Sequence, residues 1–191
     1  MSSVEDLEGQ ATTQRAVTPR SQLHAQPRAR AERAERYLLG RPHGEYNDDD
    51  VRVIVGHYYK TAQAVGLDPL LVIAQMALET GGLTSFWSQR PRRNPAGIGV
   101  TGAPGAGVSF PSWKIAVRAH TGRLLAYSLP VGEENQLQRQ LIKEALAHRP
   151  LPQRFRGVAR RLEGLTGTWA ADPQYAVKVA RVANEIRTQD L

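Results

Sequence analysis

Glu79 is an isolated carboxylate whose position suggests acid–base chemistry. It ends the apolar run that begins at Leu70, and residues 80–132 contain no Asp or Glu. A carboxyl group at the end of a buried helix is partly desolvated, which disfavours its charged form and raises its pKa. A carboxylic acid that donates a proton near neutral pH needs such a raised pKa. Glu79 is therefore the candidate general acid. The alternative is a solvated glutamate that only ends the helix.

Side chains suited to binding sugar rings lie near Glu79 and further along the sequence. Gln75 precedes Glu79 by four residues, so both lie on one helix face, and Phe86 and Trp87 are expected to desolvate the carboxyl group. Sugar rings have apolar faces and polar rims, which favours flat aromatic surfaces mixed with amide and hydroxyl groups. Core packing is the alternative for each aromatic residue. The candidate binding residues are Gln75, Ser85, Trp87, Asn94, Trp113, Tyr127 and Trp169.

Metal and thiol chemistry is not expected from this composition. The chain has no cysteine, and its five histidines show no metal-ligand spacing, so we expect neither a metal site nor a cofactor. His120 falls in a helix that should face the central one. We predict that it is buried and hydrogen-bonded rather than catalytic, and we predict the same for His57.

The elements that must position these residues are mostly helices. Asp68 and Pro69 together predict a helix start, because Asp caps helices and Pro suits the first position. The following helix is apolar nearly all round, which is typical of a central helix, and Gly81 and Gly82 end it. Helices are predicted at 29–40, 51–66 (after the capping segment 47–50), 69–80, 113–129, 133–149 and 172–189, with a weaker one at 154–165.

A glycine- and proline-rich segment, 94–112, interrupts the helices. We expect a small irregular β-hairpin there, beside the catalytic groove. Residues 1–30 are polar and lack an apolar period, so we expect a flexible tail followed by one domain over 31–191. The fold class is accordingly mainly α, with a small hairpin.

The chain is basic, which points to anionic partners. Its 191 residues have a net charge of +7, and residues 51–132 hold two acids against eight bases. Anionic wall polymers, nucleic acid and acidic lipid surfaces would be attracted, although a merely solubilising surface is the alternative. No recognised nucleic-acid motif is present, and no apolar run approaches the ~20 residues that span a bilayer. We expect neither nucleic-acid binding nor membrane insertion. The first twenty residues lack the apolar core of a signal peptide, so the export route stays open.

Four ordered blocks carry a family resemblance. They are "PLLVIAQMALETGGLTSFWS", "NPAGIGVTG", "GVSFPSWKIAVRAHTGRLLAY" and "ADPQYAVKVARVANEI". In this order they resemble the bacterial peptidoglycan glucosaminidases of glycoside hydrolase family 73, which include autolysins and the flagellar enzyme. The resemblance covers roughly residues 48–187. By position, Glu79 matches the family's catalytic acid and Tyr175 its catalytic tyrosine, while Asn94 and Gly97 match its loop motif.

The resemblance implies a lysozyme-like helical fold that cleaves the β-1,4 bond after N-acetylglucosamine in peptidoglycan. It implies action outside the cell or in the cell wall, with glycan strands as the partner. A second carboxylate, where one has been proposed in the family, lies after the catalytic helix, where this chain has none; Gly99 also replaces a common lysine. Either Asp172 serves instead, or the substrate's own 2-acetamido oxygen attacks C1. We favour the acetamido group, with Tyr175 orienting it.

Two rival functions remain open from the sequence. A lytic transglycosylase or muramidase uses a lone Glu at a similar helix end, although "ETGG" and "NPAGIGV" stand here in place of the blocks more usual in those enzymes. A non-catalytic basic module that binds the cell wall is the second rival.

Overall fold

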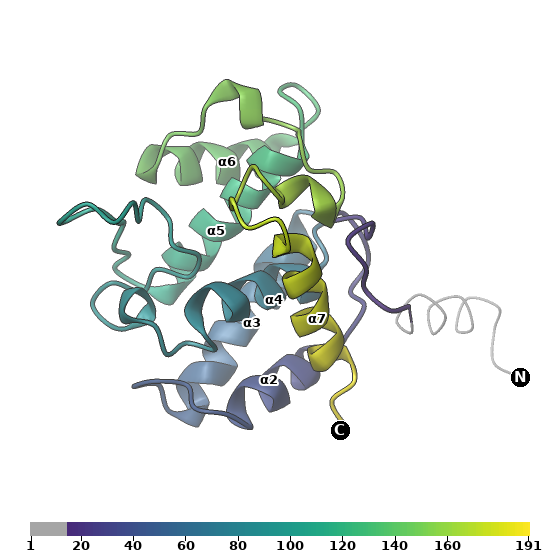
Figure 1. Cartoon of the computed structure of the whole chain (residues 1–191), viewed down its shortest axis with the longest axis vertical. Coiled ribbons are helices and arrows are strands. Elements are labelled where there is room, and N and C mark those ends of the chain that lie inside the picture. Colours follow the sequence, from purple (N-terminus) through teal and green to yellow (C-terminus); the bar gives the residue numbers. More distant parts are fainter. Residues whose placement is uncertain (1–14) are drawn as a thin grey trace, which may run out of the picture.

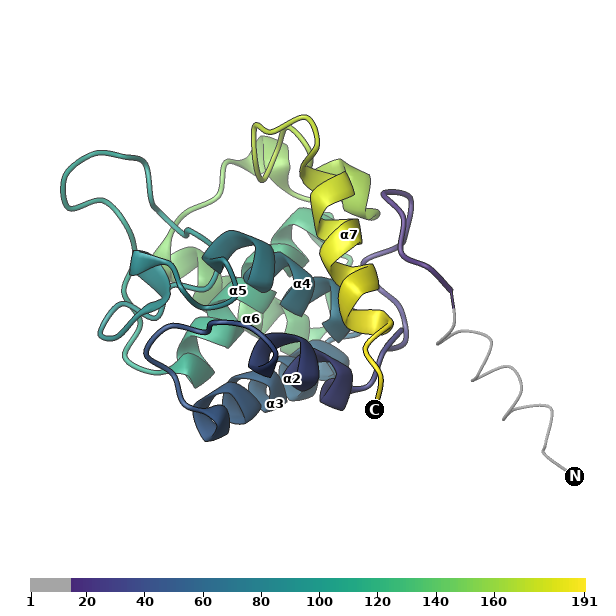
Figure 2. The same ribbon diagram turned by 60° about the horizontal axis from the view of Figure 1, so that its bottom comes forward.

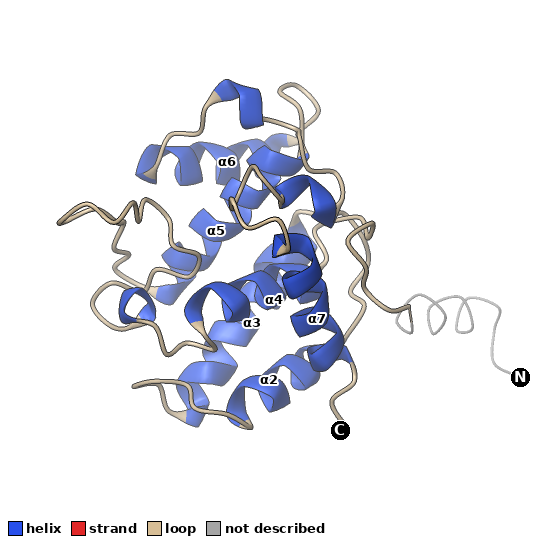
Figure 3. Cartoon of the chain, viewed as in Figure 1, coloured by secondary structure: helices blue, strands red, loops and turns tan. Residues whose placement is uncertain are grey.

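The computed structural model describes residues 15–191, and its regular structure there is helical (Figures 1 and 3). The α-helices are α2 (Ala31–Leu39), α3 (Asp48–Ala64), α4 (Pro69–Thr80), α5 (Trp113–Ser128), α6 (Gln136–His148) and α7 (Tyr175–Arg187). Short 3₁₀ turns are η1 (Phe86–Ser88), η2 (Gln153–Phe155) and η3 (Leu162–Leu165). The mainly helical prediction is confirmed. None of these helices is both long and apolar enough to cross a membrane.

Helix α4 lies at the centre of the molecule (Figures 1 and 2). It contacts α3 on one side and α7 on the other, and α5 and α6 pack beyond α3. Ten of its residues are buried, from Pro69 through Ala77 and again at Thr80. Because α4 is enclosed on several sides, it has no solvent-exposed face that needs polar residues, and its sequence is therefore apolar nearly all round.

Capping fixes both ends of this central helix. The Asp68 carboxylate accepts a hydrogen bond from the Leu70 amide (3.0 Å), and Pro69 occupies the first helical position. Gly81 ends the helix with φ of +57°, a left-handed conformation that glycine adopts without a steric penalty. Both signals were read correctly from the sequence, so the position of Glu79 one residue before the C-terminus of α4 was predictable.

The predicted hairpin at 94–112 does not form. The structure shows a loop there, and the described residues contain only isolated bridges and no strand (Figure 3). One backbone hydrogen bond, from the Val108 amide to the Ile98 carbonyl (2.9 Å), joins its two sides. The Asn94 side chain donates to the carbonyls of Ile98 and Val108, which a strand ladder would otherwise use. Glycines with positive φ, such as Gly99 at +73°, also prevent extended pairing.

Part of the expected tail packs against the domain. Residues 1–14 lie outside the described residues, but Val17, Leu23 and Ala29 are buried. Asn184 of α7 bonds both backbone groups of Val17 (2.8 and 2.7 Å). Arg28 forms an ion pair with the buried Asp68 (2.6 Å). The sequence predicts Asp68 only as a helix cap. The packed domain therefore begins before Ala31.

Several helices are shorter than the sequence indicated; α6, for example, begins at Gln136 rather than at residue 133. The weak pattern at 154–165 yields only the turns η2 and η3, separated by Gly157 at φ +71°. A Cβ at Gly157 would lie 2.7 Å from the Pro130 nitrogen, so this backbone is pressed against its neighbour and cannot continue as a helix. Helix α7 begins at Tyr175 rather than at Asp172, whose carboxylate accepts from the Gln174 amide (2.9 Å).

Candidate active site

Glu79 and Tyr175 meet although 96 residues separate them in the sequence. The Tyr175 hydroxyl donates to Glu79 Oε1 at 2.7 Å, which joins the C-terminal end of α4 to the N-terminal end of α7. Tyr175 is 4% exposed, whereas Glu79 is only partly buried. The pair therefore combines a fixed, buried donor with a carboxyl group that reaches the surface.

A chain of hydrogen bonds continues from this pair into the core. Gln75 Nε2 donates to the Tyr175 hydroxyl oxygen (2.8 Å). Gln75 Oε1 lies 2.8 Å from His120 Nε2, and His120 Nδ1 lies 2.8 Å from the Tyr58 hydroxyl. The chain thus links α3, α5, α4 and α7 in one line. We call these residues, from Tyr58 to Glu79, the polar chain.

The donors of the polar chain all point toward Glu79. An amide oxygen can only accept, so His120 Nε2 carries the proton that it donates to Gln75. Burial lowers the pKa of His120 to about 3, so the ring is neutral and Nδ1 accepts from Tyr58. Each hydrogen bond between Tyr58 and Glu79 then has one donor and one acceptor. The direction leaves Glu79 Oε2 as the oxygen that a proton can occupy.

Burial raises the pKa of Glu79 above its ordinary value. Hydrogen bonds from the Tyr175 hydroxyl and the Trp169 indole oppose this effect, because both stabilise the carboxylate. No charged side chain among residues 15–191 contributes to the shift. The site therefore favours a protonated carboxyl group by desolvation and keeps it oriented by two neutral donors.

The loop at 94–99 faces the second oxygen of Glu79. A Cβ placed on Gly97, which has φ of +62°, would lie 3.9 Å from Oε2. Asn94 shapes this loop: its Oδ1 accepts from the amides of Ala96 and Ile98 (3.3 and 2.9 Å). The amide donors of Asn94 are also used, by Ile98 and Val108. Gly97 thus leaves open space next to the proton-bearing oxygen.

Two aromatic residues, Trp169 and Tyr127, pack beside the polar chain. The Trp169 ring lies 5.8 Å from the His120 ring and 5.0 Å from that of Tyr127. Trp169 is partly exposed, whereas Tyr127 is 4% exposed and its hydroxyl bonds the Thr168 carbonyl (3.4 Å). Trp169 is the aromatic residue that combines contact with Glu79 and access to solvent.

This arrangement of a buried-helix glutamate and a tyrosine donor lies within a segment that matches a known family. The sequence model of the glucosaminidase family, described as mannosyl-glycoprotein endo-beta-N-acetylglucosaminidase, matches residues 55–188. The chain belongs to this glucosaminidase family. It is accordingly a glycoside hydrolase, as its sequence blocks indicated.

Other comparisons add one structural relative. The catalytic domain of the autolysin Auto from Listeria monocytogenes is similar over 100% of this chain and 99% of its own, with 17% identity and a TM-score of 0.47. A comparison with curated proteins finds no match.

Several residues predicted to bind sugar have other roles in this glucosaminidase-family chain. Trp113 is 7% exposed and packs edge-on against Tyr46, with ring centroids 5.7 Å apart, so it is a core residue. Asn94 is 1% exposed with its amide fully bonded, so its role is to shape the loop. Ser85 caps η1 by accepting from the Ser88 amide (3.3 Å). The geometry does not support these three as substrate ligands.

The aromatic pair that follows α4 was also misplaced. Phe86 and Trp87 were expected to desolvate Glu79, but Phe86 is 66% exposed, with Arg92 3.6 Å above its ring. The Trp87 indole lies against Gly107, where a Cβ would meet the ring at 2.2 Å, and so anchors the glycine-rich loop. Tyr175 is the ring residue whose hydroxyl bonds Glu79, and Trp169 contributes to the pKa of Glu79.

Asp172 does not provide a free second carboxylate. One of its oxygens accepts from the Gln174 amide, and the other forms an ion pair with Lys178 (2.5 Å). The Lys178 ammonium and these hydrogen bonds lower the pKa of Asp172. Asp172 therefore stabilises the turn before α7, although it does not cap the helix, whose N-cap is Gln174. Among residues 15–191, no three His, Asp or Glu side chains gather in a way that could hold a metal ion.

Tyr58 and the connecting role of His120 were missed by the sequence analysis. His120 is buried and hydrogen-bonded, as predicted, but nothing in its spacing indicated that it bonds Gln75. Tyr58 is fully buried and lies 62 residues before its histidine partner. The helical pattern predicts that both face inward, but it cannot predict which inward groups meet.

The neutral state of His120 predicts a pH-dependent stability. Its pKa is about 3 in the folded protein and 6.5 in the unfolded chain, so between these values only the unfolded chain binds the proton. Stability should therefore fall as the pH drops below 6.5, by about 1.4 kcal/mol per pH unit from this group. In His120→Gln, which can still donate to Gln75 and accept from Tyr58, urea unfolding between pH 7 and 4 should show a shallower slope. An unchanged slope in His120→Gln would contradict the prediction.

Proposed function

We propose that this chain is an endo-β-N-acetylglucosaminidase that hydrolyses the β-1,4 bond after N-acetylglucosamine in peptidoglycan. The observation that carries the proposal is the Glu79–Tyr175 hydrogen bond at the end of the buried helix α4. Family membership supports the bond type, and the order of the four sequence blocks supports peptidoglycan as the substrate. Action in the cell wall follows from that substrate.

In the proposed mechanism Glu79 is the general acid. Burial raises its pKa, which favours the protonated form that a general acid needs. The proton on Oε2 passes to the glycosidic oxygen as the bond between C1 and that oxygen breaks. The open space at Gly97 admits the leaving sugar to Oε2, since no side chain occupies it.

The nucleophile in this proposal is the substrate's own acetamido group. Its carbonyl oxygen bonds to C1 as the leaving group departs, giving a cyclic oxazolinium intermediate. Water then bonds to C1 from the side opposite the acetamido oxygen and gives a proton to the Glu79 carboxylate. The bond between C1 and the acetamido oxygen breaks, which restores the acetamido group and leaves the configuration at C1 retained. This route needs no second carboxylate.

Electrostatics around Glu79 favour this route over a two-carboxylate mechanism. A base or nucleophile would have to lie roughly 5–9.5 Å away. Within residues 15–191, burial raises the pKa of Glu79, and charge repulsion from another carboxylate does not contribute to the shift. Asp172, the candidate from the sequence, is held by Lys178.

The sequence suggested that Tyr175 orients the acetamido group, but its hydroxyl donates to Glu79 instead, and we assign it two other tasks in this mechanism. Its hydroxyl fixes Glu79 Oε1, which leaves Oε2 to carry the proton toward the substrate. As the carboxyl group loses that proton, the same hydrogen bond strengthens and stabilises the carboxylate. Gln75 holds the tyrosine oxygen in place from the core side, so we assign Gln75 to positioning rather than to contact with sugar.

Two measurements on digested peptidoglycan test the proposal. Mass spectrometry should find reducing N-acetylglucosamine ends. Reducing N-acetylmuramic acid ends would indicate a muramidase, and 1,6-anhydro ends a lytic transglycosylase. NMR of the first product should show the β-anomer, because the acetamido route retains configuration; an α-anomer would exclude that route. Binding without any hydrolysis would favour a wall-binding module.

A further inference from the structure

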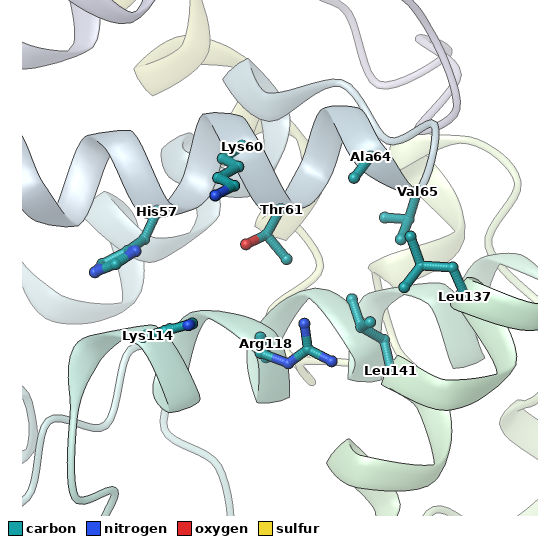
Figure 4. A pocket seen from close by; sticks show the side chains of 9 residues that line it. All are labelled: His57, Lys60, Thr61, Ala64, Val65, Lys114, Arg118, Leu137 and Leu141. Atoms are coloured by element: carbon teal, nitrogen blue, oxygen red, sulfur yellow. The ribbon is translucent and has the colours of Figure 1, made fainter.

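A basic groove lies between α3, α5 and α6, and neither the polar chain nor the family match accounts for it. It has a volume of about 210 Å³. Helix α3 contributes His57, Lys60 and Thr61, α5 contributes Lys114 and Arg118, and α6 contributes Leu141. Figure 4 shows the side chains of Lys60 and His57 on one wall, facing those of Lys114 and Arg118 on the other. His57 was predicted to be buried and hydrogen-bonded, but it is half-buried and open to this groove.

The two lysines bring uncompensated positive charge to the groove. Within residues 15–191, neither Lys60 nor Lys114 has a carboxylate at ion-pair distance. Arg118 differs, because Glu144 binds it through two hydrogen bonds of 2.8 Å. The pKa of His57 is lowered, first by burial and then by the positive charges of Lys114 and Lys60. Two like charges facing each other across a gap repel, and an anion between them would remove that repulsion.

The remaining surface of the groove is apolar. Val65 and Leu141 are buried at its floor, and Leu137 is 39% exposed at its edge. Thr61 supplies a hydroxyl group on the α3 wall. A ligand that fits this surface carries negative charge on a skeleton of carbon and hydroxyl groups. A bare inorganic anion would leave the apolar floor unused.

We propose that the basic groove binds phosphodiester groups of an anionic cell-wall polymer. The two non-bridging oxygens of a phosphodiester share one negative charge and lie apart on a tetrahedral phosphorus, so each can meet one lysine. The polyol or sugar units between phosphates would lie on Val65 and Leu141. This inference rests on the proposed function, because such a polymer surrounds the substrate of a wall hydrolase.

NMR titration of the full chain with a glycerol phosphate oligomer tests the groove directly. The ring signals of His57 should shift saturably, and its pKa should rise, because a bound anion offsets the charges of Lys60 and Lys114, whereas Arg118 is already paired with Glu144. In Lys60→Gln/Lys114→Gln the affinity should fall about tenfold or more, since each lysine gives a charge-assisted hydrogen bond.

A matched double variant separates the groove from net charge. Arg36→Gln/Arg181→Gln removes the same charge from exposed positions on α2 and α7, outside the groove, and should bind the oligomer within about twofold of wild type. Equal losses in both double variants would overturn the proposal, and so would the absence of a saturable His57 shift.

Inorganic phosphate should bind more weakly than the oligomer, and equal affinity would reduce the site to a phosphate site. Binding to phosphatidylglycerol vesicles but not to the oligomer would assign the groove to lipid and overturn the proposal.

Failure of the groove can be told apart from failure of the proposed glucosaminidase. The same titration is performed on Glu79→Gln protein, in which no hydrolysis is expected to disturb the measurement. Oligomer binding combined with muramidase products from wild type would reject the bond choice and keep the groove. Glucosaminidase products without oligomer binding would reject the groove proposal and keep the bond choice.

Discussion

Glu79→Gln should lower the rate of peptidoglycan hydrolysis by about a hundredfold or more, which is the usual contribution of a general acid. Glutamine has the same shape, and its oxygen can still accept from Tyr175, but it has no proton to give to the glycosidic oxygen. Release of reducing sugar ends from purified peptidoglycan measures the rate, and co-sedimentation measures binding, which should persist.

The fold of this variant should be intact. Burial raises the pKa of Glu79, so its ionised form is less favourable in the folded protein than in the unfolded chain. Glutamine removes that cost, and the melting temperature should therefore be equal or slightly higher at pH 8. Glu163→Gln, at an exposed glutamate in η3, is the control and should keep full activity. Near-normal turnover in Glu79→Gln would end the assignment of Glu79 as the acid.

Tyr175→Phe should reduce the rate on the order of a hundredfold, comparable to the loss of one preorganised donor at a developing charge. The ring stays buried, but Glu79 loses the hydrogen bond to Oε1 and Gln75 loses its acceptor. The carboxyl group is then free to rotate, and the carboxylate formed after proton transfer is less stable.

The pH dependence distinguishes this role from a merely structural one. A general acid works when protonated, so activity falls as the pH rises through the pKa of Glu79. Tyr175 lowers that pKa, so its hydroxyl opposes the effect of burial. Removing the hydroxyl should therefore raise the pKa and move the alkaline limb of kcat/KM to higher pH. Tyr59→Phe, which removes a buried hydroxyl bonded to the Ala29 carbonyl (3.0 Å), should leave the limb in place. An unmoved limb in Tyr175→Phe would count against a direct role.

Local sequence signals predicted the helices well because they act over a few residues. Asp68, Pro69 and Gly81 mark the ends of α4 through capping and left-handed geometry, which depend on the backbone within one turn. Asn47 likewise forms a capping box with Asp50 at the start of α3. The hairpin prediction was wrong because a hairpin depends on which groups bond the carbonyls of Ile98 and Val108. The Asn94 side chain competes with backbone amides for these carbonyls.

The sequence by itself determined that one carboxylate would lie at the end of a buried, apolar helix, with no other acidic residue in the next fifty residues. Spacing also placed Gln75 on the same face. Only the tertiary structure decided what those two groups contact. Tyr175, His120 and Tyr58 come from three other helices, and their meeting at hydrogen-bond distance depends on how those helices pack around α4. Helical periodicity tells that a side chain faces inward, whereas the partner it finds there is set by the packing of the whole core.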